Sequence, residues 1–203
     1  PGGHHAEALA VQGSTSLEWM NLTNEDQRYV LQVALSGEDS CALYDLSLSV
    51  DPAAFGAAVC GGDGSGAACP CGNESEDPLT GCRNSTGLGA RISVSGSNVV
   101  SANDAVFHLT QAVPNKTALL LQGQNAIAIP FKNGILCTGS PTQRLMVSPT
   151  NANGSSSSYG SIVDAAGLAP GMTRYYQWWY RSGLQSTCGM GSNFSGAVAV
   201  DWL

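Results

Sequence analysis

Residues 60–85 constrain the fold of this chain more than any other stretch of the sequence. The segment holds four cysteines but almost no side chain that can build a hydrophobic core: Cys60, Cys69, Cys71 and Cys82. Its many glycines permit backbone conformations that other residues rarely adopt, and Pro70 and Pro78 interrupt helices and central strands. Only covalent cross-links or a bound ion can order such a segment. We interpret it as a stapled junction between two β-rich modules.

The spacing of these cysteines favours disulfides over a zinc site. Zinc sites use Cys-x2-4-Cys knuckles, often with histidine, whereas Cys69 and Cys71 are separated by one residue and no histidine is nearby. Four cysteines can pair in three ways, and the sequence does not choose among them. We expect Cys69 and Cys71 to have different partners, because a bridge between them would be strained.

Three further cysteines lie outside the junction. Cys137 and Cys188 fall on well-separated candidate strands, and we predict a bridge between them that closes a loop of about 50 residues and contributes about 4 kcal/mol. Cys41 is then the odd cysteine. Either it pairs into the junction and leaves another cysteine free, or its partner lies in strands that this sequence does not contain.

The junction also resembles one that recurs in large secreted proteins of planctomycetes, myxobacteria and related bacteria. The shared pattern is Cys-x-Gly-Asp-Gly-Ser-x-x-x-Cys-Pro-Cys-Gly-Asn, which begins here at Cys60, with a later Gly-Cys-x-Asn-Ser that begins at Gly81. In those proteins the junction introduces a C-terminal β-domain of about this length, whose role is poorly defined. The resemblance covers roughly residues 60–203. It implies a secreted location and a β-fold, but no reaction.

The part before the junction is similar to the closing half of a pre-peptidase C-terminal type β-sandwich. The similarity rests on Glu18-Trp-Met-Asn, on Arg28-Tyr-Val-Leu-Gln-Val and on Tyr44-Asp-Leu-Ser-Leu-Ser-Val. The opening strands of that sandwich are missing. We therefore expect a partial β-sandwich with a flexible N-terminus over residues 1–59, the disulfide-rich junction over residues 60–85, and a β-sandwich or jelly-roll-like domain over residues 86–203.

Composition supports an all-β class and excludes several functions. Charged residues make up 11% of the chain and the 203 residues include 25 glycines, which suits short strands and turns better than helices with charged outer faces. A net charge of −7 with only two lysines disfavours a nucleic-acid partner. No apolar run approaches the ~20 residues of a membrane span. The cysteines indicate an oxidising, extracellular or cell-surface location, and we expect a processed or excised piece of a secreted precursor.

Candidate strands follow the junction every 8 to 14 residues or so, as in a sandwich or jelly roll. They are residues 91–94, 105–109, 118–121, 126–129, 135–137, 144–147, 161–163, 173–181 and 197–202.

Catalytic residues are scarce. The Gly-x-Ser-x-Gly motif of serine hydrolases is absent, and His108 is the only internal histidine. Phe107 and Leu109 flank His108 in an alternating strand, so we interpret His108 as a solvated or hydrogen-bonded structural residue. The sequence therefore predicts a protein that is not an enzyme.

The junction carries four carboxylates that are candidates for a weak calcium site, since oxygen-rich loops with glycine supply calcium ligands. They are Asp63, Glu74, Glu76 and Asp77. No EF-hand or nonapeptide repeat accompanies them, and the alternative is a solvated acidic loop. We expect no other cofactor.

An aromatic run, Tyr175-Tyr-Gln-Trp-Trp-Tyr180, is the candidate glycan-binding surface. Strand alternation puts Tyr175, Gln177 and Trp179 on one face and the other three aromatic side chains on the opposite face. One face must be core, and the other is either a platform for sugar rings or is also covered. The candidate residues are Tyr176, Trp178, Trp179 and Tyr180.

Six Asn-x-Ser/Thr sequons make the chain a candidate glycoprotein. They lie at Asn21, Asn73, Asn84, Asn115, Asn153 and Asn193.

These observations predict a secreted, non-enzymatic structural or adhesive β-protein of the cell surface. The incomplete sandwich at the start leaves sheet edges unpaired, so we expect strand completion by other copies of the chain or by upstream modules of the same precursor, which can extend into fibres. Residues 1–10 are the expected donor. The alternative is an ancillary end of a secreted hydrolase that binds polysaccharide.

Overall fold

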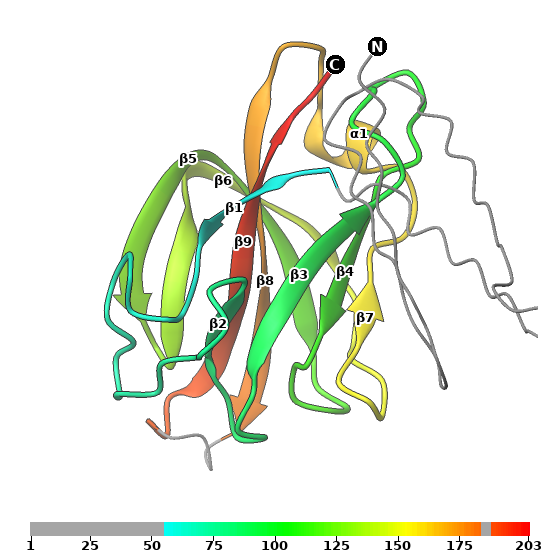
Figure 1. Cartoon of the computed structure of the whole chain (residues 1–203). Coiled ribbons are helices and arrows are strands. Elements are labelled where there is room, and N and C mark those ends of the chain that lie inside the picture. The colour runs from blue at the N-terminus through cyan, green and yellow to red at the C-terminus, as the bar shows by residue number, and fades with distance from the viewer. Residues whose placement is uncertain (1–54, 184–187) are drawn as a thin grey trace, which may run out of the picture. The chain divides into compact units, whose positions relative to one another are not determined.

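Two antiparallel sheets make up the part of the chain that the computed structural model describes, residues 55–183 and 188–203 (Figure 1). The larger sheet has the strand order β1-β9-β8-β5-β6, and the smaller sheet has the order β2-β3-β4-β7. The strands are β1 (Ala57–Cys60), β2 (Thr80–Arg83), β3 (Gly89–Ser95), β4 (Val106–Thr110), β5 (Ala118–Phe131), β6 (Gly134–Val147), β7 (Ser156–Ser157), β8 (Thr173–Gly183) and β9 (Gly191–Asp201).

The predicted all-β class is confirmed, since the described residues contain one short helix, α1 (Ile162–Ala166), beside these strands. Residues Ala54–Leu203 form one compact unit. The predicted partial sandwich of residues 1–59 falls, apart from its last five positions, outside the described residues. No helix among the described residues has the length and apolar character needed to cross a membrane.

The core lies between the two sheets, and β8 supplies its largest side chains. Tyr176, Trp178 and Tyr180 alternate along β8 and are each 0% exposed. They meet β3 and β4 side chains of the smaller sheet, with the Tyr176 ring centroid 4.2 Å from that of Phe107. The alternation predicted from sequence is therefore confirmed, and this face of β8 is the core face.

The buried tyrosine hydroxyls are hydrogen-bonded within the core. Trp202 Nε1 donates to the Tyr176 hydroxyl at 3.1 Å, and that hydroxyl donates to Gln122 Oε1 at 2.8 Å. Asn84 Nδ2 donates to the Tyr180 hydroxyl at 3.2 Å. Burial raises the pKa of both tyrosines well above the ordinary value, because the phenolate would lose its hydration.

Five of the predicted strands are differently organised in the structure. The predicted strand at residues 161–163 is wrong, because this segment begins α1. The Ser161 hydroxyl accepts from the Asp164 backbone N–H at 2.9 Å and caps the helix, which ends at Gly167 with φ of 61°. The candidates at 118–121 and 126–129 are one strand, β5, and those at 135–137 and 144–147 are one strand, β6.

The disulfide pattern corrects the predicted pairing. The bridges are Cys60–Cys137, Cys69–Cys82 and Cys71–Cys188. The predicted Cys137–Cys188 bridge is wrong, because each of these cysteines is paired with a cysteine of the junction instead. The prediction that Cys69 and Cys71 have different partners is confirmed. Cys41 lies outside the described residues, and the other six cysteines are all paired with one another.

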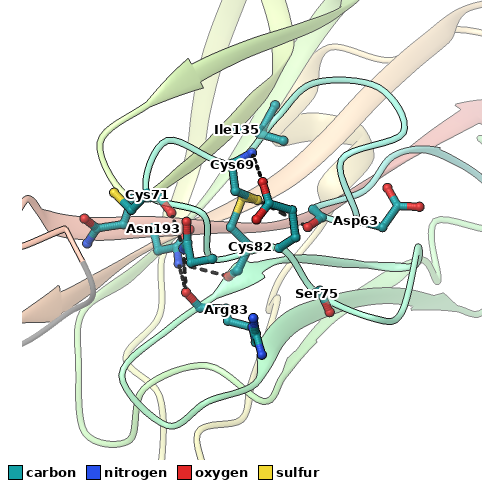
Figure 2. The surroundings of a disulfide bond; sticks show 12 residues. Asp63, Cys69, Cys71, Ser75, Cys82, Arg83, Ile135 and Asn193 are labelled. Atoms are coloured by element: carbon teal, nitrogen blue, oxygen red, sulfur yellow. Dashed lines mark hydrogen bonds between the residues drawn. A yellow bond between two sulfur atoms is a disulfide. The ribbon is translucent and has the colours of Figure 1, made fainter.

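The cysteine-rich segment differs from the separate junction predicted over residues 60–85. Its strand β2 pairs with β3 in the smaller sheet, and Cys60 ends β1 of the larger sheet. Around the Cys69–Cys82 bridge, Asn193 of β9 donates to the Cys82 carbonyl at 3.0 Å, and the Glu74 carboxylate accepts from the Cys69 backbone N–H at 3.1 Å (Figure 2). A second small core forms here from Cys69, Cys82, Ile135, Cys137 and Ala197. The segment is thus built into the domain.

Replacing Trp178 by alanine should destabilise the domain far more than replacing its neighbour Trp179. Trp178 is 0% exposed in the inter-sheet core, and removing such a side chain costs about 3–5 kcal/mol. Trp179 is half-buried on the opposite face, so we expect Trp179→Ala to cost less than half as much. Urea denaturation with the disulfides intact measures both. Equal losses would contradict the assignment of faces.

Candidate functional site

The distal half of the β5–β6 hairpin contains a stretch of β5 that is paired on one side only among the described residues. β5 pairs with β8 from Ala118 to Gly123, where the ladder ends at Gly123↔Tyr175. Beyond Gly123, β5 pairs only with β6 among the described residues. We call residues 124–139 the hairpin arm. Figure 1 shows the hairpin arching away from β8 and returning beside β1 and β9.

Two glycines allow the hairpin to bend where the arm begins. A Cβ atom added at Gly123 would lie 2.6 Å from the Gly139 carbonyl oxygen, and one added at Gly139 would lie 2.9 Å from the Asn125 carbonyl oxygen. Because real Cβ atoms do not approach backbone so closely, only glycine fits at this crossing. The ladder between β5 and β6 also shifts register between Gly123 and Asn125. The arm can therefore turn back over the larger sheet.

Gln177 fixes the β6 side of the arm to the larger sheet. Its side chain is 0% exposed. It accepts a hydrogen bond from the Cys137 backbone N–H at 2.9 Å, and its Nε2 donates to the carbonyls of Ile135 at 2.9 Å and Ser195 at 2.8 Å. One amide side chain thus joins β6, β8 and β9.

The Cys60–Cys137 disulfide is the second anchor of the arm. β1 and β6 are the two edge strands of the larger sheet, and this bridge joins them. The edge of the arm that faces β1 and β9 is therefore held covalently.

Asparagine side chains anchor the tip of the arm. The backbone N–H of Asn133 donates to the Ser192 carbonyl at 3.1 Å. The Nδ2 of the same Asn133 donates to the Ser182 hydroxyl at 2.8 Å. Asn73 Nδ2 donates to the Asn133 carbonyl at 3.0 Å. The tip is thus tied to β8, to β9 and to the cysteine-rich segment.

The opposite edge of the arm, residues 124–131 of β5, is exposed and apolar. Ile129 and Phe131 are 52% and 48% exposed, and Ala126, Ala128 and Pro130 are also exposed. No residue from 124 to 131 carries a charge. We call this stretch the free edge, since among the described residues its pairing is with β6 alone. The sequence analysis does not identify this free edge. The available signal is the run of alanine and isoleucine with no charged residue to discourage strand pairing.

The structure separates the four glycan-binding candidates. Tyr176, Trp178 and Tyr180 cannot form an exposed platform, because their face of β8 packs against the smaller sheet and each is 0% exposed. That part of the prediction is wrong. Trp179 points to the outer face of the larger sheet and is half-buried, so it alone remains a candidate.

Three of the predicted glycosylation sites are structural asparagines. Asn73, Asn84 and Asn193 are 3%, 3% and 0% exposed. Each directs its Nδ2 at two hydrogen-bond acceptors inside the fold, which leaves no room for a glycan on that nitrogen. The prediction is therefore wrong at these positions. Asn115 and Asn153 are exposed, and Asn21 lies outside the described residues.

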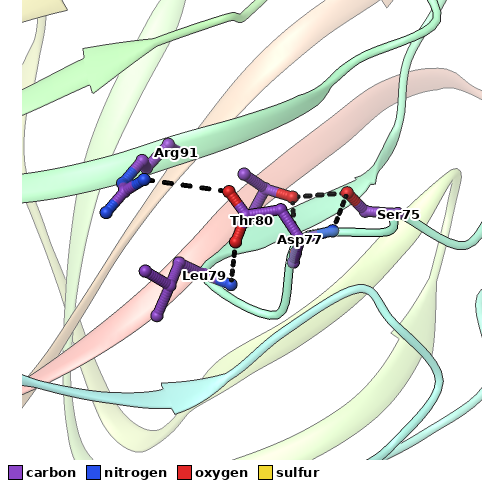
Figure 3. A network of polar contacts seen from close by, with 5 residues as sticks. All are labelled: Ser75, Asp77, Leu79, Thr80 and Arg91. Atoms are coloured by element: carbon purple, nitrogen blue, oxygen red, sulfur yellow. Dashed lines mark hydrogen bonds and ion pairs between the residues drawn. The ribbon is translucent and has the colours of Figure 1, made fainter.

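Three of the four predicted calcium ligands interact with other groups of the protein, and the fourth, Glu76, is exposed. Ser65 donates to Asp63 Oδ1 from its hydroxyl and its backbone N–H, which holds the pKa of Asp63 below its ordinary value. Asp77 accepts from the Leu79 backbone N–H and lies 3.7 Å from Arg91 (Figure 3).

Glu74 accepts from the Cys69 backbone N–H, and Glu76 is exposed. No cluster of three or more His, Cys, Asp or Glu side chains suited to a metal ion occurs in the part of the chain that the structure describes. Calcium binding by these carboxylates stays a prediction.

His108 lies on the outer face of the smaller sheet between two serines. Its Nε2 is 2.7 Å from the Ser95 hydroxyl, and its Nδ1 is 2.9 Å from the Ser157 hydroxyl. Partial burial lowers the pKa of His108 below its ordinary value. Both ring nitrogens are thus used in hydrogen bonds between strands, as expected for a hydrogen-bonded structural histidine.

Comparisons of this chain with protein-family models, with curated proteins and with solved structures found no match.

Gln177→Leu should loosen the hairpin arm. The substitution keeps a similar volume but leaves the Cys137 N–H and the Ile135 and Ser195 carbonyls without their partner, and each buried unsatisfied group costs about 1–3 kcal/mol. With three such groups we expect a loss of at least about 3 kcal/mol in the free energy of unfolding, measured in urea. Gln124→Leu, at an exposed position of the arm, is the control. A loss no larger than the control's would show that Gln177 does not anchor the arm.

Proposed function

We propose that this chain is a secreted, non-enzymatic structural or adhesive protein of the cell surface that assembles by strand addition at the free edge of β5. The donor strand comes from another copy of the chain or from an upstream module of the same precursor. The single observation that carries the proposal is the free edge itself, an exposed, uncharged strand held rigidly on its other side.

Strand addition fits the chemistry of this edge. An unpaired strand edge presents N–H and C=O groups that an extended segment can bond, and alternating side-chain pockets add specificity. Monomeric proteins protect such edges with lysines, prolines, bulges or a covering loop. The free edge contains Pro130 and a register shift between Ala126 and Ile129, but no lysine. Residues 124–131 carry no charge, and Ile129 and Phe131 expose about half of their surface.

Preorganisation favours binding at this edge. Because Gln177 and the Cys60–Cys137 bridge fix β6, the acceptor strand loses little conformational freedom when a partner strand arrives. A donor that comes from an identical chain makes a head-to-tail contact, and repetition of that contact builds a filament unless the ring closes.

The secreted location is supported by the three disulfides, which form and persist in oxidising compartments. The non-enzymatic reading is supported by the engagement of His108 with two serine hydroxyls rather than with a carboxylate.

Ile129→Lys should abolish assembly without unfolding the domain. A charge on a strand edge disfavours pairing with another strand, and an exposed position tolerates substitution within about 0.5 kcal/mol. We expect the wild-type chain to form concentration-dependent oligomers or filaments in light scattering and electron microscopy, and Ile129→Lys to remain monomeric.

Leu88→Lys is the matched control, since Leu88 is 51% exposed and lies in the turn between β2 and β3, away from the arm. It should assemble like the wild type. A wild-type chain that stays monomeric at high concentration, or equal loss of assembly in both variants, would refute strand addition at this edge.

A further inference from the structure

A groove of about 760 Å³ opens on the outer face of the larger sheet, beside the hairpin arm. Ligand sites in proteins commonly enclose roughly 300–1,000 Å³. Its lining residues come from β5, β6, β8, β9 and the tip of the hairpin, and include Leu119, Leu121, Phe131, Leu136, Trp179 and Phe194. We call it the Trp179 groove.

Trp179 supplies a flat apolar surface in this groove. On β8 its neighbours Trp178 and Tyr180 are fully buried on the core face, whereas Trp179 is half-buried and lines the groove. Its strand partners are Leu119 of β5 and Phe194 of β9, so the tryptophan stands in an apolar row. The part of the indole that is left uncovered can stack on the apolar face of a sugar ring.

Positive charges surround this apolar surface. Lys132 and Arg144 line the groove and are exposed. The Arg181 guanidinium, next to the lining, lies over the Trp179 ring, 5.9 Å from its centroid. No aspartate or glutamate is among the residues that line the groove. Within the described residues, none of these three cations forms an ion pair, since the one salt bridge there joins Arg91 to Asp77.

This concentration of cations is unusual for the chain. Of its 15 acidic and 8 basic residues, positions 1–54 hold eight acidic and one basic, which leaves seven of each for positions 55–203. The net charge of −7 therefore lies entirely in positions 1–54, and the part from 55 onward is neutral overall. Three of its seven cations gather at one groove whose lining has no carboxylate, which gives the groove a local positive potential.

The groove also contains a polar group that has no partner. The Thr138 hydroxyl is buried without a hydrogen bond, and the residue, 1% exposed, lines the groove. Buried hydroxyls are nearly always hydrogen-bonded in folded proteins, so an orphan at a binding surface is a candidate ligand contact.

We propose that the Trp179 groove binds an anionic polysaccharide. One sugar ring stacks on Trp179, and carboxylate or sulfate groups of the polymer accept charge-assisted hydrogen bonds from Arg144, Lys132 and Arg181. The Thr138 hydroxyl reaches a sugar hydroxyl after a small rearrangement of the groove wall.

An acidic peptide fits the groove less well than a sugar polymer. A peptide brings backbone N–H and C=O groups that need partners. Through the Leu119–Trp179–Phe194 row, the backbone of β5, β8 and β9 is already paired within the sheet. Sugar hydroxyls can instead rotate toward side chains and water.

The groove and the free edge share Phe131, but different substitutions test the two proposals. The groove test substitutes Trp179 and Arg144, whereas the assembly test substitutes Ile129 on the free edge, so failure of one proposal does not affect the other.

The test measures retention of the full-length chain on immobilised polygalacturonate and on neutral amylose. We expect binding to polygalacturonate that weakens with added NaCl and is absent on amylose. Arg144→Ala should weaken binding about tenfold or more, the factor that corresponds to one charge-assisted contact. Trp179→Ala should weaken it about tenfold as well, because it removes the stacking surface.

Two matched controls should bind like the wild type. Tyr159→Ala removes an aromatic ring that is 63% exposed and lies outside the groove, and Arg91→Ala removes an exposed cation of the smaller sheet. If circular dichroism shows that Trp179→Ala is unfolded, Arg144→Ala tests the proposal by itself. Arg144 is exposed, so its replacement should not unfold the domain.

Equal losses in Arg91→Ala and Arg144→Ala would mean non-specific charge attraction and would overturn the proposal. Retention unchanged in both groove variants would also overturn it. Binding of a polyglutamate peptide that depends on Arg144, with no binding of polygalacturonate, would assign the groove to an acidic protein segment instead.

Discussion

The attachment of the hairpin arm to the larger sheet is the constraint on which both proposed binding surfaces of this domain depend. Gln177 bonds three backbone groups of β6 and β9, and Cys60–Cys137 joins the two edge strands of the sheet. Because these bonds use the β6 side of the arm, the β5 side is left as the exposed edge. Phe131, Leu136 and Thr138 of the hairpin also line the Trp179 groove, so the same fold-back contributes to the free edge and to the groove.

Disulfides replace the hydrophobic core that the glycine-rich segment cannot build. The Cys69–Cys82 bridge closes a short loop of sequence separation 13, whereas Cys60–Cys137 and Cys71–Cys188 span 77 and 117 residues. Each long bridge lowers the conformational entropy of the unfolded chain, which in chain-entropy estimates stabilises the fold by about 4–5 kcal/mol. The long bridges connect the segment to the hairpin arm and to the start of β9, so they also fix the relative positions of the parts that shape the site.

The sequence predicts features that depend on local periodicity, such as the two faces of a strand. It does not predict features that depend on which residues become neighbours in space, such as disulfide partners. The alternation along Tyr175–Tyr180 correctly grouped Tyr176, Trp178 and Tyr180, because pleating imposes it. Disulfide partners were not predictable, since spacing along the chain does not say which strands become adjacent. The Asn-x-Ser pattern at Asn193 likewise does not indicate whether the asparagine side chain is buried. Ser161 with Asp164 carries the signal for a helix start, and Gly167 carries the signal for a helix end. The short Ile-Val run between them also fits a strand, which is why the sequence predicts a strand there.

Hydrogen exchange at the backbone amides of residues 124–131, apart from Pro130, tests most directly whether the β5 edge accepts a strand. In isolated copies of the chain we expect the amides directed at β6 to be protected and those directed away from β6 to exchange rapidly. In assemblies the second set should become protected as well. Protection of every amide in the isolated chain, or identical exchange in isolated and assembled chains, would contradict strand addition at this edge.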